Sequence, residues 1–217
     1  MTLAPSQVLR SLALVAVMAT WAIAAYFGST GQGRPDFNTA VGAAPFVVLL
    51  AVLLWRVRHP LALATGSLLA AGTLAWLWPS LRQNVALLYF FEHLGTNLAL
   101  AALFGKTLIG PGEALITRFA RIVNHEGLSE RQLRYTRQAT RAWTLFFLAN
   151  ATLSVLLFAL ASHAVWSFYA SLLTAPLIGL MFVAEHLWRM RVLPPAERPS
   201  IADVVRVWRQ RAAVKGS

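Results

Sequence analysis

The sequence predicts an all-α integral membrane protein with six transmembrane helices and a cytoplasmic amphipathic helical segment between helices four and five. Of its 217 residues, 58% are hydrophobic and only 12% are charged, and the mean hydropathy is +0.60. A soluble domain carries about 25% charged residues. Because lipid cannot hydrogen-bond the backbone, a spanning segment is a helix or part of a closed barrel, and these apolar runs lack the alternation of barrel strands.

The first half of the chain contains three apolar runs, at residues 8–27, 41–55 and 61–78. A helix needs about 20 residues to cross the hydrocarbon core. The first run is longer than the roughly 7–15 residues of a signal-peptide core, which favours an uncleaved helix. Gly, Pro and Asp residues predict a loop at 28–38, and Pro79 predicts a turn at 79–83. In the third run, Gly66 and Gly72 offer small positions for close helix approach.

The fourth apolar run, residues 85–104, is followed by the longest polar stretch of the chain, residues 106–141. We expect two helices in this polar stretch. The first covers residues 113–123. The second begins at Ser129, because Ser129 and Gln132 form a capping-box pattern that satisfies the free N–H groups of a helix start.

The second of these helices continues without a breaker into the fifth apolar run, residues 144–161. The sixth run, residues 164–187, contains Pro176, which predicts a kink. Residues 1–193 therefore form the transmembrane domain, and residues 194–217 form a basic tail. The tail predicts a short amphipathic helix on the membrane surface or a solvated segment, and its apolar face would carry Ile201, Val204, Val205 and Trp208.

The basic residues are distributed unevenly across the six crossings. Of 19 lysines and arginines, only Arg34 and Arg82 fall on one side. By the positive-inside rule, we expect both termini and residues 106–141 of this multi-pass protein to lie in the cytoplasm. This topology accounts for the net charge of +11, so membrane lipids are the expected partners and no nucleic-acid partner is needed.

The fourth run carries polar side chains where an apolar residue is expected. Glu92 and His93 lie near its centre, with Thr96 and Asn97 one turn further on. A carboxyl group at mid-bilayer costs about 2.5–3.5 kcal/mol on insertion scales, so it faces protein or water rather than lipid. Adjacent residues of a helix point about 100° apart, so Glu92 shares a face with Thr96, and His93 shares a face with Asn97.

The depth of each polar group in the membrane can be estimated from its distance to the cytoplasmic end of its helix, at about 1.5 Å per residue. Asn97 and Asn150 match each other in a lower layer, and Pro176 frees the carbonyl of Leu172 near the level of Glu92. The hydroxyl groups level with Glu92 belong to Thr20, Thr73 and Thr174. We therefore expect a polar core that binds a substrate through Glu92, His93, Thr96, Asn97, Asn150 and Thr174.

Three interpretations of this polar core remain open. It could be a protonatable site of a transporter or a pocket for a polar head group. It could also be interhelical hydrogen bonding, worth about 0.6 kcal/mol per bond on average. The first two are favoured because a carboxyl group is a costly way to hold helices together.

A second Glu-His-Leu triplet occurs at Glu185 and His186. Helical metal ligands recur at i, i+3 or i, i+4, a spacing that neither triplet provides, so no metal site is predicted. Pairing of Glu185 with Arg189 or Arg141 is the simpler expectation. The chain has no cysteine, which excludes disulfides, iron–sulfur clusters and cysteine-based zinc sites, and no cofactor is predicted.

The helix expected at residues 113–123 has an apolar face opposite Arg118 and Arg121, the pattern of an interfacial helix. The loop after it holds His125, which could act as a catalytic base, although no nucleophile or phosphate-binding motif accompanies it. The cytoplasmic arginines would contact lipid phosphate or an acidic partner protein. These arginines are Arg118, Arg121, Arg134, Arg137 and Arg141.

Four segments resemble a small family of bacterial inner-membrane proteins encoded among the biosynthetic genes for aryl polyene and xanthomonadin-type pigments. They are NLALAALFGKTL, GEALITRFAR, RYTRQATRAWTLFF and LLTAPLIGLMFVAEHL. The resemblance covers about half of the chain and brings no catalytic residues. It implies a setting in which polyene acyl chains are made on a carrier protein, attached to a lipid anchor and exported.

The expected function is an accessory role, without enzymatic activity, in assembly or export of a pigment lipid. The protein would bind an amphipathic, lipid-like substrate or dock its acyl carrier protein, an acidic protein that complements the arginines, or other membrane proteins of the pathway. Two alternatives remain: a proton-coupled small-molecule or lipid transporter that uses Glu92, and a membrane-embedded enzyme with Glu92 or His125 as base.

Overall fold

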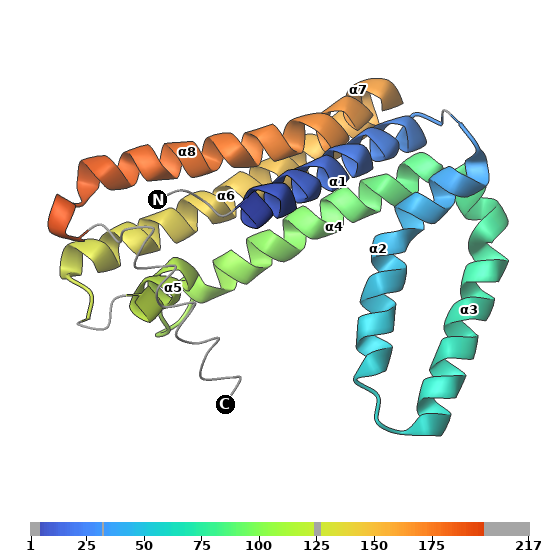
Figure 1. Ribbon diagram of the computed structural model, residues 1–217, viewed down its shortest axis with the longest axis horizontal. Coiled ribbons are helices and arrows are strands. Elements are labelled where there is room, and N and C mark those ends of the chain that lie inside the picture. The colour runs from blue at the N-terminus through green and yellow to red at the C-terminus, as the bar shows by residue number, and fades with distance from the viewer. Residues whose placement is uncertain (1–4, 32, 124–126, 198–217) are drawn as a thin grey trace. The chain divides into compact units, whose positions relative to one another are not determined.

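The computed structural model describes residues 5–31, 33–123 and 127–197, and the regular structure within these ranges is entirely helical. Short 3₁₀ turns, η1 (Lys106–Leu108) and η3 (Pro195–Glu197), accompany the main helices. Figure 1 shows the main helices in chain order: α1 (Pro5–Ser29), α2 (Pro35–Trp55), α3 (Pro60–Gln83), α4 (Val85–Gly105), α5 (Leu115–Val123), α6 (Glu130–Leu160), α7 (His163–Phe168), the π-helix η2 (Tyr169–Leu173) and α8 (Thr174–Val192).

Five helical stretches in the described part of the chain are long and apolar enough to cross a membrane. They contain the second to sixth predicted apolar runs. The first run forms α1, a 25-residue helix. The five stretches are Pro35–Trp55, Pro60–Gln83, Val85–Leu108, Glu130–Leu160 and His163–Val192.

Two predicted loop boundaries are wrong. The loop expected at residues 28–38 is shorter, because α2 begins at Pro35, where proline suits the first helical turn and Asp36 faces the positive helix start. The turn expected at residues 79–83 is helical, since α3 continues through Pro79 to Gln83. Asp36 holds this last part of α3 by accepting from the Trp78 indole at 3.0 Å and pairing with Arg82 at 3.0 Å.

The predicted capping box at the start of α6 is confirmed. The Gln132 amide N–H donates to the Ser129 hydroxyl at 3.1 Å, and the Ser129 N–H donates to the Gln132 side-chain oxygen at 2.8 Å. Glu197 packs against this helix start through two hydrogen bonds. Its carboxylate accepts from the Ser129 hydroxyl at 3.0 Å, and its backbone carbonyl accepts from the Gln132 side-chain amide at 3.0 Å. The helix then runs unbroken to Leu160, as predicted, whereas α5 begins at Leu115 rather than at Glu113.

The chain forms two compact units, and the first comprises Met1–Gly95 and Thr152–Ala175. In this unit, α1 contacts α2, α7 and η2, and α2 with α3 makes a helical hairpin (Figure 1). Its buried core surrounds Trp166, which is 0% exposed. Phe90 and Phe158 stack at 4.2 Å beside it. The buried members of this core are Ala25, Val85, Tyr89 and Trp166.

The second unit comprises Thr96–Ala151 and Pro176–Ser217. Two apolar clusters form its described core, one around Trp143 and Phe147 and one around Tyr135 and Ala139. Threonine hydroxyl groups attach α5 to its surroundings through three hydrogen bonds. These bonds join Thr117 to Thr136 at 2.7 Å, the Ile116 N–H to Thr140 at 3.3 Å and the Leu115 N–H to Thr107 at 2.9 Å.

Close helix approach in the first unit depends on glycine beside Tyr89. The Tyr89 hydroxyl donates to the Asn38 carbonyl at 3.1 Å and so joins α4 to α2. A Cβ atom added at Gly28 would lie 2.6 Å from that hydroxyl oxygen, and one added at Gly42 would lie 3.1 Å from the ring. Of the small positions predicted in α3, Gly66 is close to Leu54, whereas a Cβ at Gly72 would meet nothing within 4 Å.

We expect Gly28→Ala to destabilise the protein by about 1–3 kcal/mol, because the added methyl group must displace Tyr89 and its hydrogen bond. Thermal unfolding in detergent micelles measures the effect. Gly72→Ala is the matched control, since it adds the same methyl group to a helix in open space and should be neutral or slightly stabilising. Equal shifts for the two variants would contradict the packing role of Gly28.

Candidate functional site

His93 is the centre of the polar network in the first unit. Its Nδ1 atom lies 3.0 Å from the Ser154 hydroxyl, and its Nε2 atom lies 3.0 Å from the Thr174 hydroxyl. Ser154 is also bonded to the indole N–H of Trp166 at 3.0 Å, and both Ser154 and Trp166 are 0% exposed. The imidazole therefore joins α4 to α6 and to the start of α8.

The donors and acceptors of this network can be assigned by elimination. The Thr174 hydroxyl donates to the Tyr169 carbonyl at 3.2 Å, so it can only accept from His93 Nε2. The Trp166 indole is a donor only, so Ser154 accepts from it. In a neutral His93 ring the proton is then on Nε2, and Nδ1 accepts from the Ser154 hydroxyl.

A π-helical segment positions Thr174 for this contact. The predicted kink at Pro176 stays a prediction, because Pro176 lies inside the helix α8. The π-helix Tyr169–Leu173 comes just before it, and its end is closed by the Thr174 N–H, which donates to the Tyr169 carbonyl. Pro176 has no N–H for the carbonyl four residues earlier, which disfavours a regular α-helix here. π-Helical turns are often found at functional sites. Tyr169 also packs edge-on against the His93 ring at 5.7 Å.

Glu92 does not make the contacts expected of it. The carboxyl group is partly buried but has no hydrogen bond or ion pair with any described residue. Thr20 and Thr73, the hydroxyls expected at its level, are exposed, and Thr174 is bonded to His93 instead. The reason is the 100° turn between adjacent helical residues, which directs His93, rather than Glu92, toward Ser154 and Thr174.

The other predicted site residues belong to the second unit. Thr96 is exposed, whereas Asn97 and Asn150 are 4% and 5% exposed. The Asn150 amide donates to the carbonyl of Phe146, one turn earlier in its own helix, at 2.8 Å. Of the six predicted residues, the structure thus connects His93 and Thr174 directly.

Glu185 and Arg189 form the predicted ion pair, at 2.8 Å. The Tyr135 hydroxyl donates to the other carboxylate oxygen of Glu185, and Trp188 packs edge-on against Tyr135 at 5.5 Å. This cluster ties α6 to α8 within the second unit. Tyr135 was missed in the sequence because it lies 50 positions from Glu185 and no local spacing connects them.

Within the described ranges, no group of three or more His, Asp or Glu residues is arranged so that it could hold a metal ion.

The arginines of α5 and α6 differ in how far they are neutralised. Arg121 pairs with Glu113, and its hydrogen bond lowers the pKa of that carboxyl group. Arg134 pairs with Glu130 at 3.3 Å, and Arg137 donates to the Leu108 carbonyl at 3.2 Å. Arg118 donates to the Glu113 carbonyl at 3.1 Å. The exposed Arg141 makes no hydrogen bond or ion pair with the described chain.

Two predicted features lie outside the described residues. They are the loop histidine His125 and the tail helix beyond residue 197. Comparisons with protein-family models, with curated proteins and with solved structures found no match for this chain. The fold and the side-chain geometry above are therefore the basis for the functional proposals.

We expect His93→Ala to destabilise the protein strongly, because it removes two hydrogen bonds and leaves the Ser154 hydroxyl without its acceptor. Each buried group left unsatisfied costs about 1–3 kcal/mol. Thermal unfolding in micelles measures the loss. His186→Ala is the matched control, since His186 is exposed and has no hydrogen bond with described residues. A similar, small effect of both substitutions would show that the His93 network does not hold the helices together.

Proposed function

We propose that this chain is a multi-pass protein of the bacterial inner membrane, with both termini in the cytoplasm, that assists assembly or export of an aryl polyene-type pigment lipid. In this role it binds an amphipathic substrate or docks the acidic carrier protein that delivers it, and it catalyses no reaction itself. The exposed, partly unneutralised arginine surface of α6 is the observation that carries this proposal.

The apolar surface of the helices supports the membrane setting. No residue of α3 is buried within the chain, and large side chains such as Leu68, Leu69 and Trp76 are 66–80% exposed. Such an apolar surface on a soluble protein would cause aggregation, whereas lipid solvates it. The proposed topology adds α1, whose 25 residues are long enough for one crossing, to the five candidate spans.

The basic surface supports carrier docking. Arg134, Arg137 and Arg141 recur at i, i+3 and i+7, so they share one side of α6. Arg131 and Arg141 are exposed and have no hydrogen bond or ion pair with described residues. Their charge is therefore free to attract an acidic surface, which speeds association and selects the partner. The resemblance of these segments to proteins of pigment biosynthesis supports an acyl carrier protein as that partner.

We expect Arg131→Glu/Arg141→Glu to weaken binding of a polyene-pathway holo-acyl carrier protein to the nanodisc-embedded protein about tenfold or more, because each reversal replaces attraction with repulsion. These two positions are chosen because their replacement breaks no internal contact, unlike Arg134 or Arg137. Calorimetry at two salt concentrations measures the affinity, and the wild-type affinity should fall as salt rises.

Arg56→Glu/Arg58→Glu is the matched control for carrier docking. It makes the same charge change at exposed residues on the side proposed to be cytoplasmic, in the α2–α3 connection. Binding should be unaffected by this control. If both double variants weaken binding equally, the carrier senses only the overall charge and α6 is not its docking surface.

A second candidate function is proton-coupled transport through Glu92. The observation that favours it is the lack of any hydrogen bond or ion pair to this carboxyl group from the described chain, on a helix long and apolar enough to span the membrane. A carboxyl group that holds helices together would have partners. One that binds and releases a proton during transport must be able to change its partners instead.

We expect Glu92→Gln to abolish proton-coupled uptake in proteoliposomes while leaving thermal stability unchanged, because the amide keeps the size of the side chain but cannot ionise. Uptake of protons with a pH-sensitive dye inside the vesicles measures activity. Gly95→Ala, which adds a methyl group in open space on the same helix, is the control and should keep full uptake. Wild-type protein without proton uptake, or full uptake by Glu92→Gln, would exclude this second candidate.

A further inference from the structure

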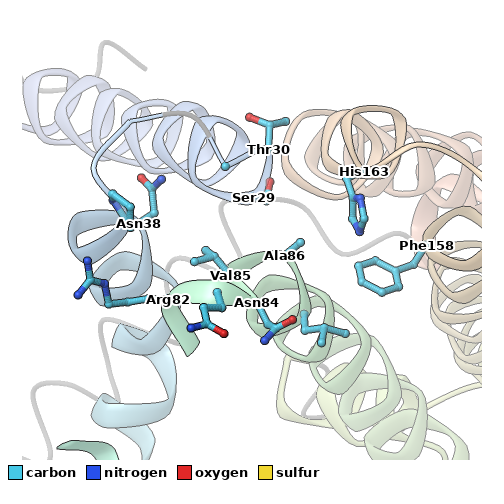
Figure 2. Close-up of a pocket in the computed structure, with 13 residues that line it drawn as sticks. Ser29, Thr30, Asn38, Arg82, Asn84, Val85, Ala86, Phe158 and His163 are labelled. Carbon is cyan, nitrogen blue, oxygen red and sulfur yellow. The ribbon is translucent and has the colours of Figure 1, made fainter. Parts of the chain in front are cut away.

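A cavity of about 480 Å³ lies at the helix ends of the first unit. Figure 2 shows Ser29 and Thr30 on one side of it, His163 and Phe158 on another, and Arg82 across from them, with the start of α4 between. No acidic side chain is among its lining residues. None of the sequence patterns indicated this cavity, because its walls come from five separate segments.

The cavity coincides with the ends of four candidate spans. Its lining residues include Pro35, Gln83 and Val85, which begin or end the stretches Pro35–Trp55, Pro60–Gln83 and Val85–Leu108. His163 opens a fourth such stretch. The ends of spanning helices lie at the membrane–water interface, where lipid head groups are found.

The cationic residues near the cavity point to the charge of its ligand. In the proposed topology, Arg34 and Arg82 are the two basic residues on the side away from the cytoplasm, and the positive-inside rule disfavours both. Arg82 lines the cavity, whereas Arg34 is not a lining residue and directly precedes the lining residue Pro35 at the start of α2. Asp36 pairs with Arg82 and offsets one of these two charges.

Further donors and acceptors line the same space. Val85 and Ala86 occupy the first turn of α4, where backbone N–H groups have no intrahelical partner. The His163 ring packs edge-on against Phe158 at 5.5 Å, and its nitrogens make no hydrogen bond with described residues. An imidazole and free N–H groups suit an anionic oxygen ligand, and Phe158 with Leu87 offers apolar surface beside it.

We propose that this cavity binds the phosphate group of an anionic amphiphile at the outer face of the membrane. The inference deepens the proposed function and rests on its topology, because it names a head-group site for a lipid-like ligand. Arg82 supplies the positive charge in the cavity wall, while His163 and the first turn of α4 supply hydrogen bonds. The shared chemistry is a phosphate ester, whose source is a phospholipid or a soluble molecule.

The first arm of the test compares lipids. Native mass spectrometry of protein released from nanodiscs should show retained phosphatidylglycerol in preference to phosphatidylcholine. Arg82→Gln should lower that retention about tenfold, the loss expected for one charge-assisted hydrogen bond. Arg58→Gln, which removes a charge from the opposite side of the proposed topology, should leave it unchanged. Equal retention of both lipids by the wild-type protein overturns a lipid source.

The second arm separates anion binding from the ion pair with Asp36. Asp36→Asn breaks the same pair as Arg82→Gln but leaves the guanidinium in place, so phosphatidylglycerol retention should be maintained or increased. If both substitutions lower retention equally, Arg82 acts only through Asp36 and the proposed anion site is overturned. Thermal unfolding of each variant shows that it remains folded.

The third arm identifies the source of the phosphate and checks the topology. Binding of sn-glycerol 3-phosphate without a lipid preference would support the anion site and assign it to a soluble phosphate ester, whereas binding of neither probe overturns it. Gln83→Cys, introduced into a chain without cysteine, should react with a membrane-impermeant maleimide from outside the cell. If the Gln83→Cys variant is labelled from outside but binds neither phosphate probe, the topology holds and only this site is overturned. If the variant is labelled only from the cytoplasm, the proposed topology is overturned, and so is the inference that rests on it.

Discussion

The two ring nitrogens of His93 join three helices of the first unit through the hydroxyl groups of Ser154 and Thr174. The network runs from the Trp166 indole through Ser154, His93 and Thr174 to the Tyr169 carbonyl. Every donor in it has an acceptor, as a buried polar group in a dry environment requires. The π-helical turn before Pro176 belongs to this network, because its first residue, Tyr169, provides the carbonyl that accepts from Thr174.

In the second unit, different groups hold the helices together. Threonine hydroxyls hold α5, and the Tyr135–Glu185–Arg189 cluster holds α8 against α6. The carboxylate of Glu185 is compensated by both a cation and a hydroxyl group, which offsets the cost of removing it from water. Glu92 differs from Glu185. Its carboxyl group has no comparable partner, which is the reason to consider it for function rather than for folding.

The two proposals rest on different charged groups in different units. The exposed arginines Arg131 and Arg141 of α6 belong to the second unit and suit an acidic protein partner. The cavity lined by Arg82 belongs to the first unit and suits a phosphate group.

The helical content, the apolar runs, the Ser129–Gln132 capping box and the Glu185–Arg189 pair were determined by the sequence itself, because each depends on residues within a turn or two of one another. Even locally, competing signals shifted boundaries: Pro35 starts a helix inside a predicted loop, and Pro79 does not end one. Tertiary structure alone decided that His93, rather than Glu92, meets Ser154 and Thr174, that Tyr135 reaches Glu185, and that five segments enclose a cavity. Helical periodicity predicts which side chains share a face, but it carries no information on which distant helix that face will contact.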